Sequence, residues 1–374
     1  MQRAAVPLRD WIFGLFDADG RTEEGQPRNR GEATHVIILD GTMSSLEPGH
    51  ETHAGMTYKL LNEAGMKANL TVHYEAGIQW RDWRGTWDVM TGKGINRQIE
   101  RAYGVLASRY RPGDKIVLIG YSRGAYAVRS LSGVIDVVGL VKADCATQRN
   151  ITTAYRHYRT GGRSKFTDKF RRDHCHPRHE TPIEAVAVWD TVRALGLRVP
   201  VLWRWMPDAH KHHNHSLGIH VRNGFHALAL DETREAYAPV LWTTRIGSRS
   251  HIEQVWFRGT HTDVGGQLGK YAPAKPLANI SLVWMLGRLA VCELPLPEGW
   301  EERFDTDPHG VSAGSWRGWG KIFWARKRRL VGIDASERLH HTVNPMKYRK
   351  SFVRDFNGSR LSREDTTEAA PQSS

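Results

Sequence analysis

A short apolar run leads directly into a serine flanked by glycines, and no other feature constrains the fold and chemistry of this chain as strongly. Residues 115–125 read Lys-Ile-Val-Leu-Ile-Gly-Tyr-Ser-Arg-Gly-Ala, a buried-type strand that enters Gly-x-Ser-x-Gly and then a helical pattern. Gly120 and Gly124 are expected to let the backbone turn tightly around Ser122. The pattern predicts a nucleophile elbow, while a purely structural strand-to-helix turn is the alternative.

A serine hydroxyl is a weak nucleophile at neutral pH, so Ser122 needs both a base and donors for an oxyanion. The helix that follows Ser122 directs its N-terminal amides, including that of Arg123, to the place where negative charge would form. A second donor is expected from the turn after an upstream strand, near Gly41 or Thr42. Asp40 is expected to support that turn.

An acid and a histidine follow the serine in the chain order Ser, Asp, His. Asp190 ends the apolar run at 183–190, at the edge where doubly wound sheets place functional groups. His261 lies in a loop after the strand-like run at 252–257 and is the candidate base. Either Asp190 or Asp263 is positioned to orient that histidine. Asp190 is preferred, because Asp263 lies only two residues from His261 and is better suited to bonding loop amides.

Strand signals alternate with helical segments along the chain. They occur at residues 36–39, 69–73, 116–119, 186–189 and 255–257. This alternation predicts an α/β-hydrolase-like, mostly parallel sheet with helices on both faces. The predicted organisation is an N-terminal anchoring helix and loop at 1–33, a catalytic domain at 34–300 with insertions at about 140–181 and 193–225, and a basic, Trp-rich C-terminal extension at 301–374 with a disordered tail.

The composition is strongly basic. The chain has 53 Lys and Arg against 40 Asp and Glu, a formal net charge of +13 at pH 7. Such a charge favours anionic surfaces such as phospholipid head groups or nucleic acid, although it also serves solubility alone. Interleaved tryptophans and cationic residues at 316–330 suit a membrane interface, or packing of the extension on the domain. Peripheral contact with an anionic membrane is expected, and nucleic acid is not.

Cysteine usage and the absence of targeting segments bear on the compartment. Cys145, Cys175 and Cys292 are scattered without paired spacing, which argues for a reducing environment. The N-terminus lacks the apolar region of a secretory signal, and no stretch approaches the length of a membrane span. A cytoplasmic location is therefore expected. No metal or organic cofactor is expected.

Five sequence blocks succeed one another in a recognisable order. They lie at residues 39–42, 120–126, 188–192, 226–232 and 256–266, and they extend over most of positions 34–270. In these blocks the chain resembles the type VI secretion phospholipase-effector-like catalytic domain, a branch of the α/β-hydrolases. It departs from the family pattern where Met43-Ser44-Ser45 replaces a nearby asparagine, and where Gln267 replaces a third glycine.

The resemblance implies hydrolysis of phospholipid esters by a triad of Ser122, Asp190 and His261. It also implies secretion machinery and an immunity protein as partners, with export by a type VI system that needs no cleavable signal. An apolar run at 195–206 is then expected to cap the serine and recruit a lipid chain. Core packing is the alternative for that run, and small soluble esters are the second choice of substrate.

Two interpretations from other classes stay open at this stage. In one, the domain is catalytically idle and binds a membrane or a protein. In the other, Asp40, Asp190, His261 and Asp263 hold a divalent metal and the chain hydrolyses a phosphodiester. The interpretation favoured by the residues is a serine hydrolase that cleaves carboxylic esters, with lipid esters first.

Overall fold

The computed structural model describes residues 31–65, 69–77, 93–192, 216–245, 247–315 and 325–353. Four sequence-based expectations lie outside these residues. They are the anchoring helix near the N-terminus, the apolar run at 195–206, the tryptophans at 316–324 and the disordered tail.

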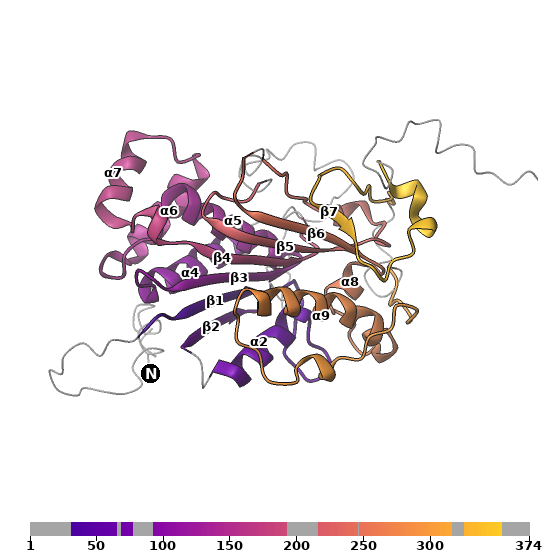
Figure 1. Cartoon of the computed structure of the whole chain (residues 1–374). Coiled ribbons are helices and arrows are strands. Elements are labelled where there is room, and N and C mark those ends of the chain that lie inside the picture. Colours follow the sequence, from indigo (N-terminus) through magenta and orange to yellow (C-terminus); the bar gives the residue numbers. More distant parts are fainter. Residues whose placement is uncertain are drawn as a thin grey trace, which may run out of the picture. The chain divides into compact units, whose positions relative to one another are not determined.

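A seven-stranded sheet forms the centre of the described structure, and all its pairings are parallel (Figure 1). Its strands are β1 (Thr34–Leu39), β2 (Leu70–Glu75), β3 (Lys115–Tyr121), β4 (Ile183–Trp189), β5 (Val221–Ala229), β6 (His251–Phe257) and β7 (Glu337–Leu339). Their spatial order is β2-β1-β3-β4-β5-β6-β7. The expectation of a mostly parallel α/β sheet is confirmed.

Helices cover both faces of the sheet, as expected. One side carries α4 (Lys93–Arg109) and α5 (Arg123–Val138), with α6 (Gln148–Arg159) packed on both and α7 (Lys165–His174) on α6. The other side carries α2 (His53–Gly65), α8 (His261–Val264) and α9 (Lys275–Val291). Short 3-10 helices lie at Ala143–Cys145, Arg178–Glu180, Glu235–Tyr237, Ala272–Ala274, Glu301–Arg303 and Pro345–Ser351. Within the described ranges, no helix combines the length and apolarity needed to traverse a bilayer.

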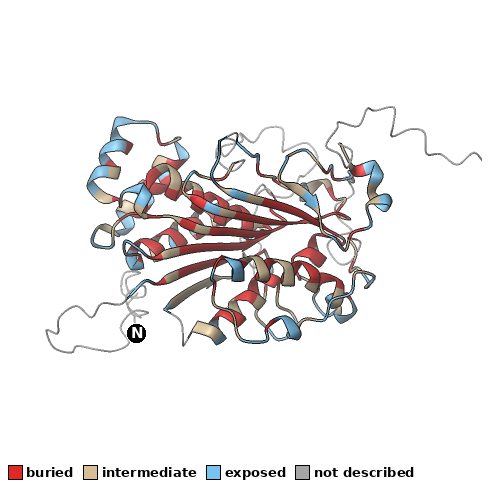
Figure 2. Cartoon of the chain, in the orientation of Figure 1, coloured by how far each residue is buried: buried red, intermediate tan, exposed pale blue. Residues whose placement is uncertain are grey.

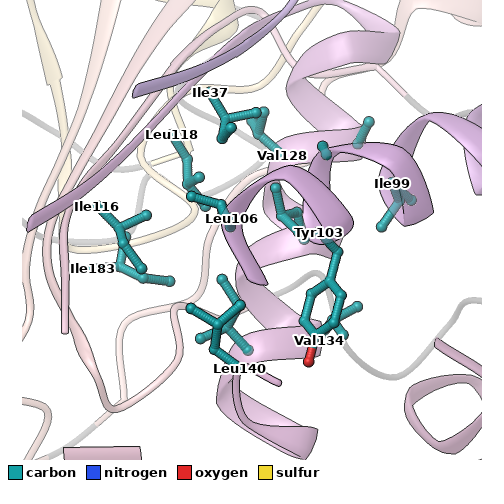
Figure 3. Close-up of a cluster of buried hydrophobic side chains, with 14 of the residues drawn as sticks. Ile37, Ile99, Tyr103, Leu106, Ile116, Leu118, Val128, Val134, Leu140 and Ile183 are labelled. Carbon is teal, nitrogen blue, oxygen red and sulfur yellow. The ribbon is translucent and has the colours of Figure 1, made fainter. Parts of the chain in front are cut away.

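Alternate side chains of each central strand enter opposite cores, because successive residues of a strand point to opposite faces. In β3, Ile116 and Leu118 pack with α4 and α5, in the cluster drawn in Figure 3. Val117 and Ile119 pack with the helices of the other face. The central strands are accordingly buried along most of their length (Figure 2), which explains their near-continuous apolar sequences.

Two strands fall outside the sequence-based scheme. β5 begins at Val221, inside the range expected to be an insertion ending at 225. The polar and small residues of its first half have structural roles. Asn223 Nδ2 donates to Glu184 O at 3.0 Å. Gly224 packs against Leu217, because a Cβ at this position would lie 2.2 Å from the Leu217 side chain. β7 comes from the predicted C-terminal extension and pairs with β6. The extension therefore supplies the edge of the sheet.

The strands β1 and β3 are neighbours in the sheet. The chain leaves β1 toward β2 on one side and leaves β3 toward β4 on the other, so the loops that follow β1 and β3 run in opposite directions. Such a switch point opens a crevice at the carboxyl ends of the two strands, where open α/β sheets place their ligands. The loop after β1 carries Gly41, and the turn after β3 carries Ser122. The fold thus brings the predicted oxyanion loop beside the predicted nucleophile.

Gly124 permits the closest approach between these two segments. A Cβ at this position would lie 2.1 Å from Leu39 O, a backbone atom that cannot swing away. We expect Gly124→Ala to lower the free energy of unfolding by about 3 kcal/mol, as overpacking does. The control is Gly287→Ala in α9, where nothing lies within 4 Å of the new methyl. Denaturant titration measures both, and equal stabilities would contradict this packing.

Candidate active site

Ser122 occupies a strained turn between β3 and α5. Its φ is 57° and its ψ is −118°, a region that residues with a Cβ rarely adopt. The turn is held because Ser122 N–H donates to Trp189 O at 3.0 Å, which joins it to the end of β4. The turn also lies against the loop after β1, since a Cβ placed on Gly41 would lie 3.4 Å from Ser122 Cβ.

His261 lies within hydrogen-bond distance of that serine. It is the first residue of α8, after a three-residue loop that follows β6, and its Nε2 is 2.9 Å from Ser122 Oγ. Its ring is buried, stacked on Tyr121 at 5.0 Å and met edge-on by Tyr237 at 4.8 Å between ring centroids. Packing from two sides fixes the plane of the imidazole.

Asp190 contacts the other nitrogen of the same ring. It follows β4, is fully buried, and its Oδ2 lies 2.6 Å from His261 Nδ1. A second carboxylate oxygen, Oδ1, accepts from Ala229 N–H at 3.0 Å. An ionised carboxylate can only accept a hydrogen bond, so Nδ1 must donate and the proton of the neutral ring lies on Nδ1. Nε2 is then free to accept from the serine hydroxyl.

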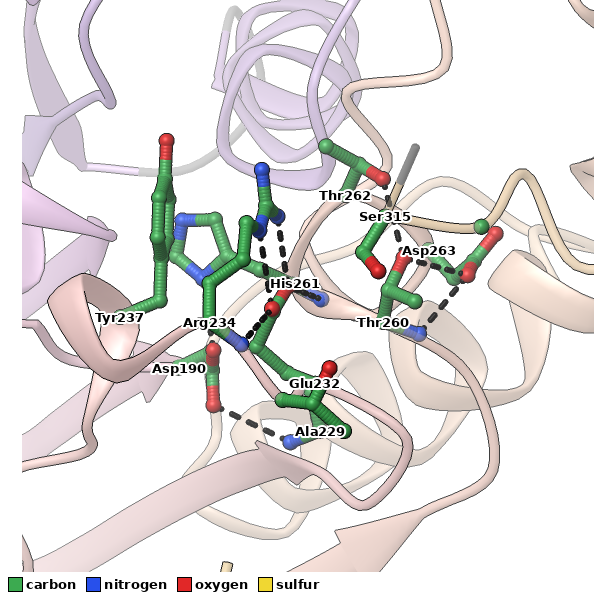
Figure 4. A network of polar contacts seen from close by, with 12 residues as sticks. Asp190, Ala229, Glu232, Arg234, Tyr237, Thr260, His261, Thr262, Asp263 and Ser315 are labelled. Atoms are coloured by element: carbon green, nitrogen blue, oxygen red, sulfur yellow. Dashed lines mark hydrogen bonds and ion pairs between the residues drawn. The ribbon is translucent and has the colours of Figure 1, made fainter. Parts of the chain in front are cut away.

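Asp263, the alternative acid, has different partners. It accepts from Thr260 N–H and Oγ1–H at 2.8 Å, from Ser312 Oγ–H at 2.6 Å and from Ala313 N–H at 2.7 Å. Figure 4 shows Asp263 beside Thr260, whereas Asp190 lies beside Ala229. Asp263 closes the turn that begins α8 and ties it to residues 312–313, so it shapes the loop and does not contact the imidazole of His261.

The charges in the site shift the pKa values of both groups. Burial alone would raise the pKa of Asp190, but the Arg329 guanidinium and the bond to His261 outweigh it and hold the pKa well below its usual range. Burial lowers the pKa of His261, and the neighbouring Asp190 only partly offsets it. At neutral pH the site therefore holds an ionised aspartate and a neutral imidazole, the protonation states that a general base requires.

Arg329 is one member of the site that sequence reasoning missed. It belongs to the basic segment at 316–330, for which membrane contact or packing on the domain was expected, and it is buried against Asp190. Its Nη1 is 2.5 Å from Oδ1 and its Nη2 is 2.9 Å from Oδ2. Nothing local distinguishes it from Lys327 and Arg328, which are exposed. Only a contact between residues far apart in the sequence reveals it.

A second buried ion pair flanks the histidine. Glu232 accepts from Arg234 Nε at 2.8 Å and Nη2 at 2.5 Å, and it also accepts from His261 N–H at 3.3 Å. The Arg234 guanidinium lies 3.9 Å from the ring centre of Tyr237, as in a cation–π contact. This pair was not predicted, although Glu232 ends one of the sequence blocks. It fixes the backbone of His261 (Figure 4).

The loop after β1 is braced by Asp40, as expected. Asp40 accepts from Gly41 N–H at 2.6 Å, from Thr52 Oγ1–H at 2.6 Å and from Tyr74 OH at 2.7 Å. Burial raises the pKa of Asp40 to about 6 despite these bonds. The second oxyanion donor was expected near Gly41 or Thr42, and the Gly41 amide is already bonded to Asp40. Among the described residues no hydrogen bond joins Thr42 N–H to an acceptor, so Thr42 is the remaining candidate donor of this loop.

Both departures from the family pattern lie in this loop or against it. Gln267 Nε2 donates to Thr42 O at 2.9 Å, and Tyr121 OH lies 3.4 Å from Gln267 Oε1. Met43 has a φ of 60° and an exposed side chain. Gln267 therefore holds the carbonyl oxygen of Thr42 in place. This is a structural role for the residue that replaces the third glycine.

The metal alternative required four residues to converge, and they do not. Asp190 is bonded to His261 and Arg329, Asp40 supports its own turn, and Asp263 closes the α8 turn. A guanidinium on Asp190 would also repel a cation. In the part of the chain that the structure describes, no group of three or more His, Cys, Asp or Glu side chains is arranged around a common point suited to a metal.

Comparison with protein families places these elements in a known context. Residues 34–288 match the family described as T6SS, phospholipase effector Tle1-like, catalytic domain. The chain belongs to this family. The resemblance deduced from the five sequence blocks is thus confirmed. Ser122, Asp190 and His261 all lie inside the matched residues, whereas Arg329 lies beyond them.

Individual relatives are distant. YEL023C, an uncharacterised protein of Saccharomyces cerevisiae, is 24% identical over 270 residues, covering 63% of this chain and 37% of the yeast protein. An uncharacterised protein from Pseudomonas aeruginosa aligns with a TM-score of 0.42 and 14% identity, over 74% of this chain and 49% of that one. The Tle1 effector bound to the VgrG spike of the type VI secretion system gives 0.33 and 15%, over 69% and 58%. The chain spans less than two thirds of each relative.

Proposed function

We propose that this chain is a serine hydrolase that cleaves carboxylic esters of phospholipids or other lipids, with Ser122, His261 and Asp190 as its catalytic triad. The observation that carries the proposal is the pair of hydrogen bonds on one imidazole, 2.9 Å to Ser122 Oγ and 2.6 Å to Asp190 Oδ2. Family membership supports the lipid as substrate. The buried, neutral state of His261 supports its role as base.

In the first half of the reaction, Ser122 Oγ attacks the ester carbonyl carbon while its proton passes to His261 Nε2. The imidazolium that forms is stabilised by Asp190, which keeps its own negative charge. His261 then gives the proton to the leaving alcohol, the C–O bond breaks, and an acyl-serine is left. In the second half, water loses a proton to His261 and attacks the acyl group, which releases the fatty acid and restores Ser122.

The oxyanion of each tetrahedral intermediate is expected to lie between the amides of Arg123 and Thr42. Arg123 begins α5, so its N–H is free of intrahelical bonding and carries the positive end of the helix dipole. Thr42 belongs to the loop that Asp40 and Gln267 hold from two sides. Backbone donors fixed in advance need no reorganisation when charge develops, and each contributes about 3 kcal/mol.

Release of products from mixed phospholipid liposomes tests the substrate class. Wild-type protein is expected to liberate free fatty acid, and Ser122→Ala is expected to liberate none above background. Release of phosphorylated head group without fatty acid would contradict carboxylic ester cleavage. Hydrolysis of short soluble esters with no action on liposomes would retain the serine mechanism but would overturn the lipid assignment. No hydrolysis of either would favour the binding module.

The pKa of His261 gives the proposal a pH signature. Burial lowers that pKa from its ordinary value of 6.5, so the imidazole stays neutral and able to accept a proton to lower pH than a free histidine. We expect the acidic limb of kcat/KM to have its half-maximum below pH 6.5. The rate of Ser122 modification by a fluorophosphonate should follow the same curve. A half-maximum clearly above pH 6.5 would contradict the assignment of His261 as the base.

Delivery by a type VI secretion machine is a separate proposal that rests on the family description alone. It implies an immunity protein as a partner in the producing cell. Co-purification from cells that express neighbouring genes tests both, with a spike component and an inhibitory protein as the expected partners.

Peripheral binding to anionic membranes is a further proposal, which the net charge of +13 favours. Sedimentation with anionic and zwitterionic vesicles tests it.

A further inference from the structure

The C-terminal segment around Arg329 is attached to the loop that follows β5. Glu235 N–H donates to Ala325 O at 2.9 Å, and Lys327 N–H donates to Thr233 O at 2.7 Å. These two bonds lie on either side of an antiparallel bridge between Arg234 and Arg326. The segment therefore runs beside the residues that flank His261, and it enters the protein interior two residues later.

Arg329 makes four hydrogen bonds at the end of this path. Besides the two bonds to Asp190, Nη1 donates to Ala229 O at 2.7 Å and Nη2 donates to Tyr237 O at 2.6 Å. The side chain is only 4% exposed. A planar guanidinium can contact both carboxylate oxygens at once, while the point charge of a lysine cannot. Arg329 therefore fixes the orientation of the Asp190 carboxylate, and in this orientation Oδ2 contacts His261 Nδ1.

The charge of Arg329 also opposes that of Asp190. An isolated aspartate beside a histidine stabilises the imidazolium and makes the ring more basic. Here the guanidinium bound to Asp190 reduces that stabilisation. The other charged or titratable groups around His261 are Glu232 and Arg234 from the loop after β5, Tyr237 from that same loop, and Tyr121 from β3. Glu232 and Arg234 are paired with each other and shift the pKa of His261 in opposite directions, Glu232 upward and Arg234 downward. Arg329 is the cation bonded to Asp190 itself.

We propose that Arg329 is a positioning residue that fixes the orientation of Asp190 and limits the basicity of His261. The C-terminal segment thereby completes a site whose other members lie inside the family domain. This inference rests on the proposed function, because it assigns Arg329 a role in tuning that same triad. It predicts that the domain at 34–300 alone lacks part of its catalytic machinery.

The test compares the pH dependence of kcat/KM in the full chain and in substitutions of Arg329. Arg329→Gln and Arg329→Met remove the charge, so we expect the acidic limb to move up by about one pH unit, with kcat falling about 10- to 100-fold from misplacement of Asp190. Arg329→Lys keeps the charge but loses the fork, so we expect the limb to stay in place while kcat falls about 10-fold. Arg326→Lys on the same segment is the matched control and should change neither.

Several outcomes would overturn the inference. A neutral variant with lowered activity but an unmoved acidic limb would make Arg329 merely structural. If neither neutral variant folds, full activity in Arg329→Lys would overturn the positioning role by itself. Fluorophosphonate labelling separates these results from failure of the proposed function. Absence of a Ser122 adduct in the wild type removes the triad, whereas a labelled wild type with an unmoved limb in the variants removes only the role of Arg329.

Discussion

Ser122→Ala is expected to lower kcat for ester hydrolysis by roughly 10⁵- to 10⁶-fold, because it removes the atom that forms the acyl intermediate. His261→Ala is expected to lose about as much, since Ser122 Oγ has its base 2.9 Å away on that ring. The double variant should be no worse than either single variant, because the two groups act in one step. Initial rates on a chromogenic ester, with thermal melting to verify folding, measure all three.

Ser108→Ala is the control for this series. Ser108 lies exposed on α4 and donates only within its own helix turn, to Val105 O at 3.0 Å. It should retain the wild-type rate. Full activity in Ser122→Ala together with loss of activity on chelation would contradict the serine mechanism and return attention to a metal. Additive losses in the double variant would show that Ser122 and His261 act separately.

Asp190→Asn is expected to reduce kcat on the order of 10⁴-fold, because an amide at this position no longer fixes the proton on His261 Nδ1. The paired experiment is Asp263→Asn, which loosens the α8 turn but leaves the 2.6 Å contact of Asp190 with His261 in place. We expect that variant to lose less than about 10-fold in kcat while its thermal midpoint falls. The two carboxylates are thereby distinguished by chemistry and by stability.

An equal loss of kcat in both aspartate variants would contradict the assignment of Asp190 as the orienting acid. Asp190→Asn also leaves the buried guanidinium of Arg329 without its counter-ion, so it should destabilise the fold by several kcal/mol. The double variant Asp190→Asn with Arg329→Met should recover part of that stability but none of the activity. Denaturant titration beside rate measurement separates the two effects.

The features that were predictable from sequence are those with a local signal. β3 and β4 are buried on both faces and therefore read as apolar runs, so their carboxyl ends located Ser122 and Asp190 directly. His261 was found because it follows a third strand, β6, whose last three residues are apolar. Parallel strands bring their carboxyl ends to one edge, and that rule alone placed three distant residues in one crevice. Their catalytic roles stay a proposal.

The features that escaped prediction depend on contacts between distant residues. β7 is three residues long, reads Glu-Arg-Leu, and becomes a strand only because β6 offers it an edge. Arg329 looks like its exposed neighbours until the fold brings it to Asp190, 139 residues away. The sequence left Gly41 and Thr42 as alternative donors, because it could not show that the Asp40 side chain turns back onto the Gly41 amide.

The most direct test of the central claim is site-resolved labelling with a fluorophosphonate, which reacts only with an activated serine. Mass spectrometry of digested wild-type protein should find one adduct, on Ser122. His261→Ala should abolish the adduct even though the serine is still present, because its hydroxyl has lost the base. An unlabelled Ser122 in folded wild-type protein, or equal labelling in His261→Ala, would contradict the account.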